Sequence, residues 1–238
     1  MSGLLTIKTL EIVHLSTHFM TIPIAVFSSW WYGKRYGYSV KKSISYGVLL
    51  TLLVVLFTYA CKWIPGWLGY TVFLNSYRSF LFIPVFALFM CKAWGIPTLE
   101  GMDFVTPIMF LERTVVLVGC TLLGCGLAVE CDWGTYNHAL GCRVFPMDLI
   151  DLIANFAVTI LSLAYAKRLE YKGNGRIFVF AMYLQSVVRL FIQFGSRECW
   201  WGIKGFNDES VYSIIAIILA IMIYLRNRKT DRNQSVKQ

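Results

Sequence analysis

Charged residues are scarce in this chain. Asp, Glu, Lys and Arg make up only 15% of its 238 residues, whereas 57% are hydrophobic. The mean hydropathy is +0.60. A soluble domain needs more charge than this to cover its surface. The composition therefore excludes a soluble globular protein and indicates a chain that crosses a membrane several times.

Acidic residues are the scarcer kind, at 13 against 22 Lys and Arg, which gives a net charge of +9. The basic residues gather in three places: Lys34, Arg35, Lys41 and Lys42; Lys167, Arg168, Lys172 and Arg176; and Arg226, Arg228, Lys229, Arg232 and Lys237. With seven membrane crossings all three clusters fall on one side, and the positive-inside rule makes that side cytoplasmic. We expect residues 226–238 to form a basic cytoplasmic tail that contacts anionic lipid rather than nucleic acid.

Seven apolar stretches are long enough to span a bilayer, which takes roughly 20 residues. They cover about 12–31, 44–61, 71–91, 104–127, 147–166, 176–195 and 210–225. We therefore expect an all-α, polytopic bundle of about seven transmembrane helices, with its N-terminus outside and its C-terminus inside. Residues 1–238 would form one integral membrane domain of the plasma membrane. The first ten residues lack the basic segment of a cleavable signal peptide, and no internal repeat is evident.

Metal-binding spacing is also lacking. The chain has no C-x-x-C pair, and its three histidines do not cluster with its seven cysteines along the sequence. This pattern predicts neither a metal site nor a cofactor, and His14 and His18 are interpreted as interfacial polar residues. Cys131 and Cys142 fall in a predicted outer loop, where they either form a disulfide in an oxidising compartment or stay free.

The few charges inside the predicted spans are the most informative residues, because an ionisable group at bilayer depth is costly and marks function. Arg189 is flanked on both sides by apolar residues. It either forms a structural ion pair with Asp148 or Asp151, or it receives an anion, since a guanidinium binds phosphate through two hydrogen bonds. Several inward-facing arginines around one cavity would suit a phospholipid head group. The other charges within spans are Arg78, Glu112 and Arg113.

Four motifs, read in order from Asp103 to the last span, resemble the prolipoprotein diacylglyceryl transferase family. The resemblance is faint before Asp103. The motifs are Asp103-x3-Pro107; Gly119-Cys120-x3-Gly124-Cys125; Phe145-Pro146-Met147-Asp148-Leu149-Ile150-Asp151; and Gly175 followed by Tyr183-x5-Arg189-Leu190-Phe191-Ile192-Gln193 and Arg197.

The resemblance implies an enzyme of lipoprotein biosynthesis that moves a diacylglyceryl group from phosphatidylglycerol to a lipobox cysteine thiol of a preprotein, on the outer face of the membrane. The thiol must lose its proton, and the departing phosphate needs cationic stabilisation. The implied catalytic residues are Arg189, Arg113 and Tyr77, with Asp148 as a second candidate proton acceptor. The implied substrate-binding residues are Arg78, Cys120, Gly124, Asp148, Asp151, Tyr183, Gln193 and Arg197, with no metal.

The sequence departs from the family pattern at several of its charged positions. The family's essential Arg falls on Leu117, and its His-Gly-Gly box falls near Tyr77-Arg78-Ser79. Arg113 precedes Leu117 by four residues and so lies on nearly the same helix face, about 6 Å away along the axis. Among the principal charged residues only Arg189 is carried over unchanged. Two alternatives therefore stay open: a non-catalytic phospholipid-binding protein on the same scaffold, and an unrelated transporter or sensor.

Overall fold

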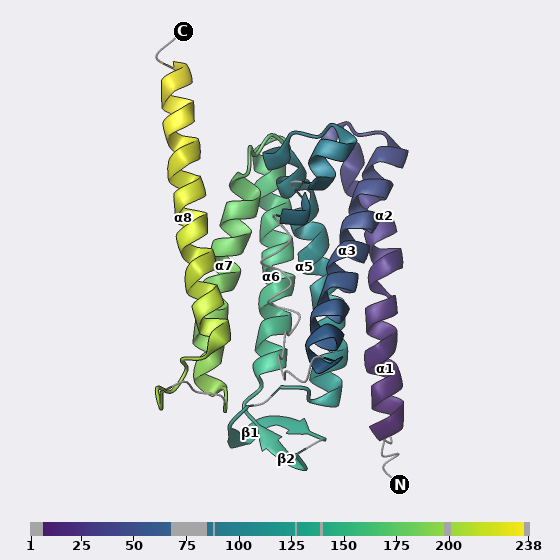
Figure 1. Cartoon of the computed structure of the whole chain (residues 1–238), viewed down its shortest axis with the longest axis vertical. Coiled ribbons are helices and arrows are strands. Elements are labelled where there is room, and N and C mark those ends of the chain that lie inside the picture. Colours follow the sequence, from purple (N-terminus) through teal and green to yellow (C-terminus); the bar gives the residue numbers. More distant parts are fainter. Residues whose placement is uncertain are drawn as a thin grey trace.

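The chain folds into a bundle of long helices with one small β-hairpin (Figure 1). The computed structural model describes residues 7–67, 85–87, 89–126, 128–138, 140–197 and 201–235. The helices are α1 (Ile7–Phe19), α2 (Thr21–Gly33), α3 (Val40–Trp67), α5 (Thr98–Leu123), α6 (Met147–Arg168), α7 (Arg176–Ile192) and α8 (Asp208–Ser235). Two short 3-10 helices are η1 (Lys34–Tyr36) and η2 (Gln193–Gly195), and the strands are β1 (Glu130–Asn137) and β2 (Cys142–Val144).

Six stretches of the described chain are helical, apolar and long enough to cross a membrane: Lys8–Tyr36, Val40–Phe57, Thr98–Leu123, Met147–Arg168, Arg176–Gly195 and Asp208–Arg226. They correspond to six of the seven predicted spans. The predicted span at 71–91 lies mostly outside the described residues, and only a shorter apolar helix at Val85–Trp94 is seen near it. The multi-pass helical architecture is confirmed, and the count of seven stays a prediction.

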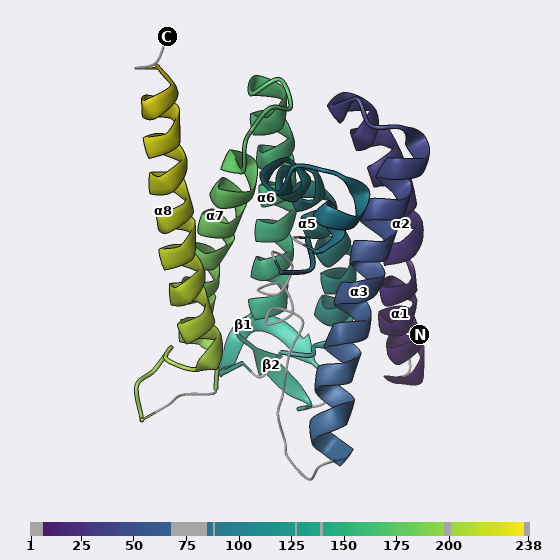
Figure 2. The same ribbon diagram turned by 45° about the horizontal axis from the view of Figure 1, so that its top comes forward.

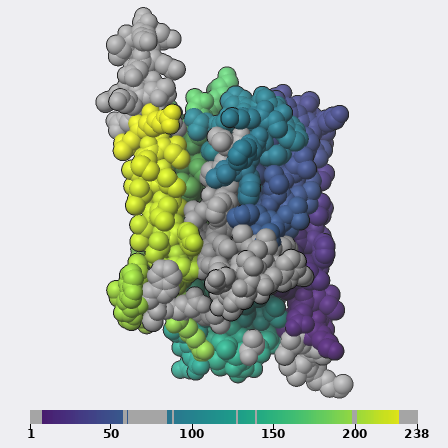
Figure 3. Space-filling model, viewed as in Figure 1, coloured from purple at the N-terminus to yellow at the C-terminus, as the bar shows by residue number. Residues whose placement is uncertain are grey.

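Helix α5 is the centre of the bundle. It packs against α1 and α2 on one side and against α6 and α7 on the other, and α8 packs on α7. Figure 2 shows this order, with α1, α2 and α3 to one side of α5 and α6, α7 and α8 to the other. In the space-filling view α8 and α1 form opposite edges of the molecule (Figure 3). Many large apolar side chains of the bundle, such as Phe19 of α1, Ile153 of α6 and Ile218 of α8, are exposed, as expected of a surface that faces lipid.

Small residues let α2 and α3 approach closely. A Cβ atom added at Gly47 would lie 1.9 Å from the Ser29 hydroxyl, and one added at Gly33 would lie 2.0 Å from the Ser43 hydroxyl. Such contacts are typical of membrane helices, where association depends on packing because lipid is as apolar as the helix surfaces.

The segment from Glu130 to Pro146, predicted as an outer loop, contains the hairpin instead. β1 and β2 pair antiparallel, with Tyr136 opposite Arg143 and Asn137 opposite Cys142. The segment that starts at Gly195, between the predicted spans at 176–195 and 210–225, contacts the hairpin segment. The Val129 amide donates to the Gly195 carbonyl (2.9 Å), and Arg197 forms an ion pair with Glu130 (2.6 Å). The bond between Val129 and Gly195 thereby satisfies part of the backbone of both segments. Figure 1 shows the hairpin below α6.

The two ends of the bundle differ in charge. The α2–α3 turn, the α6–α7 turn and the C-terminal end of α8 lie at one end, whereas the hairpin and the N-terminal end of α1 lie at the other (Figure 1). The first two basic clusters of the sequence fall in those two turns. The structure therefore gathers them at one end, and the assignment of that end to the cytoplasm stays a prediction.

Candidate functional site

Polar residues form a stripe along the facing sides of α6 and α7. Asp151 and Asn155 are one turn apart on α6. Gln185 and Arg189 of α7 and Gln193 at the start of η2 follow at four-residue intervals, and all five are buried. Residues four apart lie on one helix face. These side chains face inward because lipid offers their polar groups no hydrogen-bond partner.

Asp151 is the hub of this stripe and is only 1% exposed. Its Oδ2 accepts from Arg113 Nη2 and from Arg189 Nη1, each at 2.9 Å. Its Oδ1 accepts from Gln185 Nε2 (2.8 Å) and Asn155 Nδ2 (3.0 Å). Four donors from α5, α6 and α7 therefore converge on one carboxylate, which removes much of the cost of burying it.

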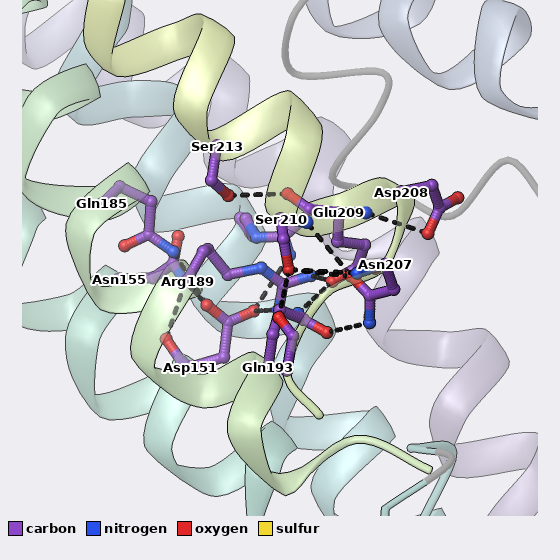
Figure 4. Close-up of polar contacts among 12 residues, drawn as sticks. Asp151, Asn155, Gln185, Arg189, Gln193, Asn207, Asp208, Glu209, Ser210 and Ser213 are labelled. Carbon is purple, nitrogen blue, oxygen red and sulfur yellow. Dashed lines mark hydrogen bonds and ion pairs between the residues drawn. The ribbon is translucent and has the colours of Figure 1, made fainter. Parts of the chain in front are cut away.

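Arg189 also reaches the last helix. Its Nη2 donates to Glu209 Oε2 at 2.5 Å, and Gln193 Nε2 donates to the same oxygen at 2.5 Å (Figure 4). We refer to Arg113, Asp151, Arg189 and Glu209 as the arginine cluster. Its three ion pairs join α5 to α6, α6 to α7 and α7 to α8. The cluster therefore connects the four C-terminal helices at one depth in the bundle.

Hydrogen bonds extend from the cluster to an apolar groove. Asn207 Nδ2 donates to Gln193 Oε1 (2.8 Å), and Asn207 Oδ1 caps α8 by accepting from the Ser210 amide (3.1 Å). Ser210 lines a groove of about 530 Å³ between α7 and α8. The groove is otherwise lined mainly by apolar side chains, namely Val187, Leu190, Phe191, Phe194, Ile203, Phe206 and Ile214, with Lys204 and Gly205. The arginine cluster and the apolar groove thus lie next to each other.

Two further acids on α5 face away from the cluster. Glu112 accepts from the Thr51 hydroxyl of α3 at 2.9 and 3.1 Å, whereas Arg113 points to α6, as expected of adjacent residues on a helix. Asp103 accepts from the backbone amides of Gly175 (2.8 Å) and Phe178 (2.9 Å). It therefore caps the N-terminus of α7 from a neighbouring helix.

The histidines do not cluster with the cysteines along the sequence, but in the folded chain His14 lies beside two cysteines. His14 on α1, Cys120 near the end of α5 and Cys125 just beyond it have possible ligand atoms that all lie within 4.8 Å of one another. This proximity could not be predicted from the sequence, because His14 and Cys120 are 106 residues apart. Cys131 and Cys142 are both free thiols in the structure.

The structure brings some of the predicted site residues together. Arg113, Arg189, Asp151 and Gln193 belong to one hydrogen-bonded network, and Asp148 is close enough to both arginines to interact electrostatically. Asp148 also accepts from the Gly126 amide at 3.0 Å.

Other predicted residues lie elsewhere. Tyr183 is on a different face of α7 and is 46% exposed. Arg197 is at the hairpin, paired with Glu130, and Gly124 ends α5 with a φ of +74°. Cys120 is beside His14. Tyr77 and Arg78 lie outside the described residues.

Sequence reasoning missed three members of the network: Glu209, Gln185 and Asn155. Gln185 and Asn155 could have been predicted, because Gln185 lies four residues from Arg189 and Asn155 four residues from Asp151, each on the same helix face. Glu209 could not have been predicted, since it lies in the first turn of α8, and acidic residues are common at the start of any helix.

Comparison with known proteins identifies the family of the chain. The family model for prolipoprotein diacylglyceryl transferase matches residues 45–226, about three quarters of the chain. The chain belongs to the prolipoprotein diacylglyceryl transferase family. No curated protein and no solved structure matches it. As a member of this family of transferases of lipoprotein biosynthesis, it is a multi-pass membrane protein.

The family match is longer than the resemblance that the motifs carried, since it begins in α3 rather than at Asp103. It includes the whole arginine cluster and the apolar groove. Helices α1 and α2, and with them His14, precede the matched region. The His14–Cys120–Cys125 group is therefore built partly from outside the part of the chain that defines the family.

Proposed function

We propose that this protein transfers a diacylglyceryl group from phosphatidylglycerol to a lipoprotein cysteine thiol, and that Arg189 and Arg113 bind the phosphate that leaves. The observation that carries the proposal is the convergence of these two guanidinium groups, from α7 and α5, on a single oxygen of Asp151. Two cations this close, buried among membrane helices, form a ready receptor for an anion.

The carboxylates of Asp151 and Glu209 occupy the guanidinium donors in this structure. A phosphate diester carries the same negative charge as a carboxylate and accepts the same paired hydrogen bonds. The ion pairs and the receptor role are therefore compatible, because an entering phosphate competes with a carboxylate of the cluster. Arg189 is the pivotal residue, since it holds two carboxylates through two different nitrogens.

The apolar groove supports a lipid as the donor. Its aliphatic and aromatic walls suit an acyl chain. Ser210, which lines it, is four hydrogen bonds from Arg189 through Asn207, Gln193 and Glu209. A donor whose tail lay in this groove would bring its head group toward the cluster. Small-molecule sites typically combine apolar walls with a few convergent polar groups in this way.

The reaction follows from the chemistry of the groups. The acceptor cysteine loses its proton, and the thiolate forms a C–S bond to the glyceryl carbon that carries the phosphate ester. The C–O bond to that phosphate breaks, and glycerol phosphate leaves with the electron pair. Arg189 and Arg113 stabilise the developing charge. Asp148, near both arginines, is the proposed proton acceptor, and Tyr77 is the alternative.

A reconstituted assay tests this proposal. The purified protein in liposomes receives labelled phosphatidylglycerol and a lipobox peptide, and released glycerol phosphate and lipidated peptide are measured. We expect turnover by the native protein and a loss of about 10²–10³-fold for Arg189→Ala. Arg113→Leu should also lower turnover. Arg168→Ala, which removes an exposed arginine at the end of α6, is the matched control and should have no effect.

Two outcomes would contradict the proposal. Phosphatidylglycerol binding without any turnover, lost in Arg189→Ala, would favour a non-catalytic phospholipid-binding protein. Turnover that survives Arg189→Ala while thermal stability falls would show that the arginine cluster is only structural.

A further inference from the structure

The end of α5 next to the hairpin carries a group of soft ligand atoms that the arginine cluster does not use. The imidazole of His14 and the thiols of Cys120 and Cys125 come from two separate segments of the chain, and their ligand atoms all lie within 4.8 Å of one another. Imidazole nitrogen and thiolate sulfur are the preferred ligands of zinc and of cuprous copper. We propose that His14, Cys120 and Cys125 bind a thiophilic d10 metal ion, Zn²⁺ or Cu⁺, which fastens α1 to the end of α5.

The distances fit such an ion closely. Tetrahedral zinc holds sulfur about 2.3 Å and nitrogen about 2.0–2.1 Å away, so its ligand atoms lie roughly 3.5–3.8 Å from one another. His14 Nδ1 and Cys120 Sγ are 4.0 Å apart. Shifts of about 1 Å, within reach of small χ rotations, therefore complete the coordination. Because Cys125 is exposed, water can take a fourth position.

Two glycines build the site. Gly119 lets α1 approach α5, since a Cβ atom there would lie 2.9 Å from His14 Cα and 2.5 Å from the Thr17 hydroxyl. Gly124 ends α5 in the left-handed region, where its amide and that of Cys125 both donate to the Cys120 carbonyl (2.8 and 3.2 Å). This turn folds Cys125 back over Cys120.

The residues beyond Cys125 hold the turn in place. The Gly126 amide donates to Asp148, and its carbonyl accepts from Asn137 Nδ2 of the hairpin at 3.1 Å. Such outer contacts orient metal ligands. The Asp148 carboxylate also adds negative charge beside the thiols, which favours a cation.

The geometry also explains what the metal would do. Much of the surface of α1 is apolar and exposed, and α1 precedes the region that defines the family. Binding of Zn²⁺ by two thiols and one neutral imidazole releases two protons and forms two Zn–S bonds and one Zn–N bond. The ion would thus hold α1 against the helix that carries Arg113, and this inference stands independently of the proposed transferase activity.

The test uses the full-length protein, purified in detergent under reducing conditions and freed of metal with a chelator. Co²⁺, a spectroscopic substitute for Zn²⁺, is titrated while thiolate-to-cobalt charge-transfer absorption is recorded, and Zn²⁺ is then added in competition. A parallel titration measures Cu⁺ against a coloured chelator. We expect one equivalent of metal per chain and at least about tenfold weaker binding in His14→Ala, Cys120→Ser and Cys125→Ser.

Cys131→Ser and Cys142→Ser are the matched controls, since they remove hairpin thiols and should leave binding unchanged. Arg189→Ala should bind metal normally, which separates this inference from the proposed function. Absence of stoichiometric metal, or binding that depends on the hairpin cysteines, would overturn the proposal. A Cys120–Cys125 disulfide, found by thiol alkylation and mass spectrometry of protein prepared without reductant, would overturn it as well.

Discussion

Arg189 shows how much one residue can organise inside a membrane bundle. Its two terminal nitrogens donate to two different carboxylates on two different helices, Asp151 on α6 and Glu209 on α8. A lysine keeps the charge at this position but offers a single ammonium group, which cannot reproduce the planar fork of a guanidinium. The geometry of Arg189 therefore matters separately from its charge.

Arg189→Lys should consequently lower turnover, but by less than Arg189→Ala. We expect a reduction of about 10–100-fold. Deletion of a hydrogen-bond donor to the transition state typically costs about 10²–10³-fold. Initial rates of glycerol phosphate release would measure it, and Arg168→Lys is the control. Equal losses in Arg189→Lys and Arg189→Ala would show that turnover depends on the planar guanidinium and not on the positive charge. Native turnover in Arg189→Lys would show that turnover depends only on the charge.

Only some residues of the candidate site could be predicted from the sequence. Arg113, Asp151 and Arg189 could be singled out because a charge inside an apolar run is conspicuous on its own. Glu209 and His14 could not, since each lies where a polar residue is ordinary and acquires its importance from a partner on another helix. Such partners are fixed by packing, which a single sequence does not display.

At the scale of elements, α7 depends on a helix distant in sequence for its start. Its N-cap residue, Gly175, has no side chain to offer, and Asp103 of α5 accepts from the Gly175 and Phe178 amides in its place. The start of α7 fixes the rotation and height of the helix that carries Arg189. The cap at one end of the bundle therefore positions the cluster further along the helix.

Asp103→Ala should destabilise the protein by about 1–2 kcal/mol, the usual cost of a lost N-cap. It should also speed hydrogen exchange at the first amides of α7, measured by mass spectrometry in detergent. Glu100→Ala, one turn earlier on α5, is the matched control, because Glu100 accepts from the Tyr38 hydroxyl rather than from the amides of α7 that Asp103 caps. Unchanged exchange at Gly175 and Phe178 in Asp103→Ala would contradict this account.

The crossing of α1 and α5 gives a second test at this scale. Gly119→Ala places a methyl group 2.9 Å from His14 Cα, so the helices must separate, at a cost of about 1–3 kcal/mol. The midpoint of thermal unfolding should fall, and Co²⁺ binding should weaken with it. Val118→Ala, at an exposed neighbouring position, should change neither. Native stability in Gly119→Ala would show that α1 is not packed at this glycine.

Elements differed in how well the sequence predicted them. Spans of roughly 20 apolar residues are nearly self-defining, because lipid requires every backbone group to be bonded within the helix. The hairpin was missed because β1 has no clear alternation of apolar and polar residues, and its pairing depends on contacts with the Gly195–Arg197 segment. The seventh span and the single-domain boundaries stay predictions.

For the whole molecule, the distribution of basic residues predicts orientation. If the end with the α2–α3 and α6–α7 turns is cytoplasmic, a fluorescent protein fused to the C-terminus should fold and fluoresce in intact cells. A membrane-impermeant maleimide should label the hairpin thiols, Cys131 and Cys142, from outside, and Cys131→Ser/Cys142→Ser is the control. Labelling of these thiols only after the membrane is permeabilised would show that the hairpin end faces the cytoplasm, opposite to the prediction.

The ion pair between Arg189 and Glu209 has a consequence for how the bundle responds to a ligand. It joins α7 to α8, the helices that form the walls of the apolar groove. An anion that takes the place of Glu209 on Arg189 removes that tether, and thermodynamic reciprocity requires that loosening the tether strengthen anion binding by an equal free energy. In the proposed transferase, capture of a lipid head group by Arg189 would therefore be energetically coupled to separation of α7 from α8 beside the groove.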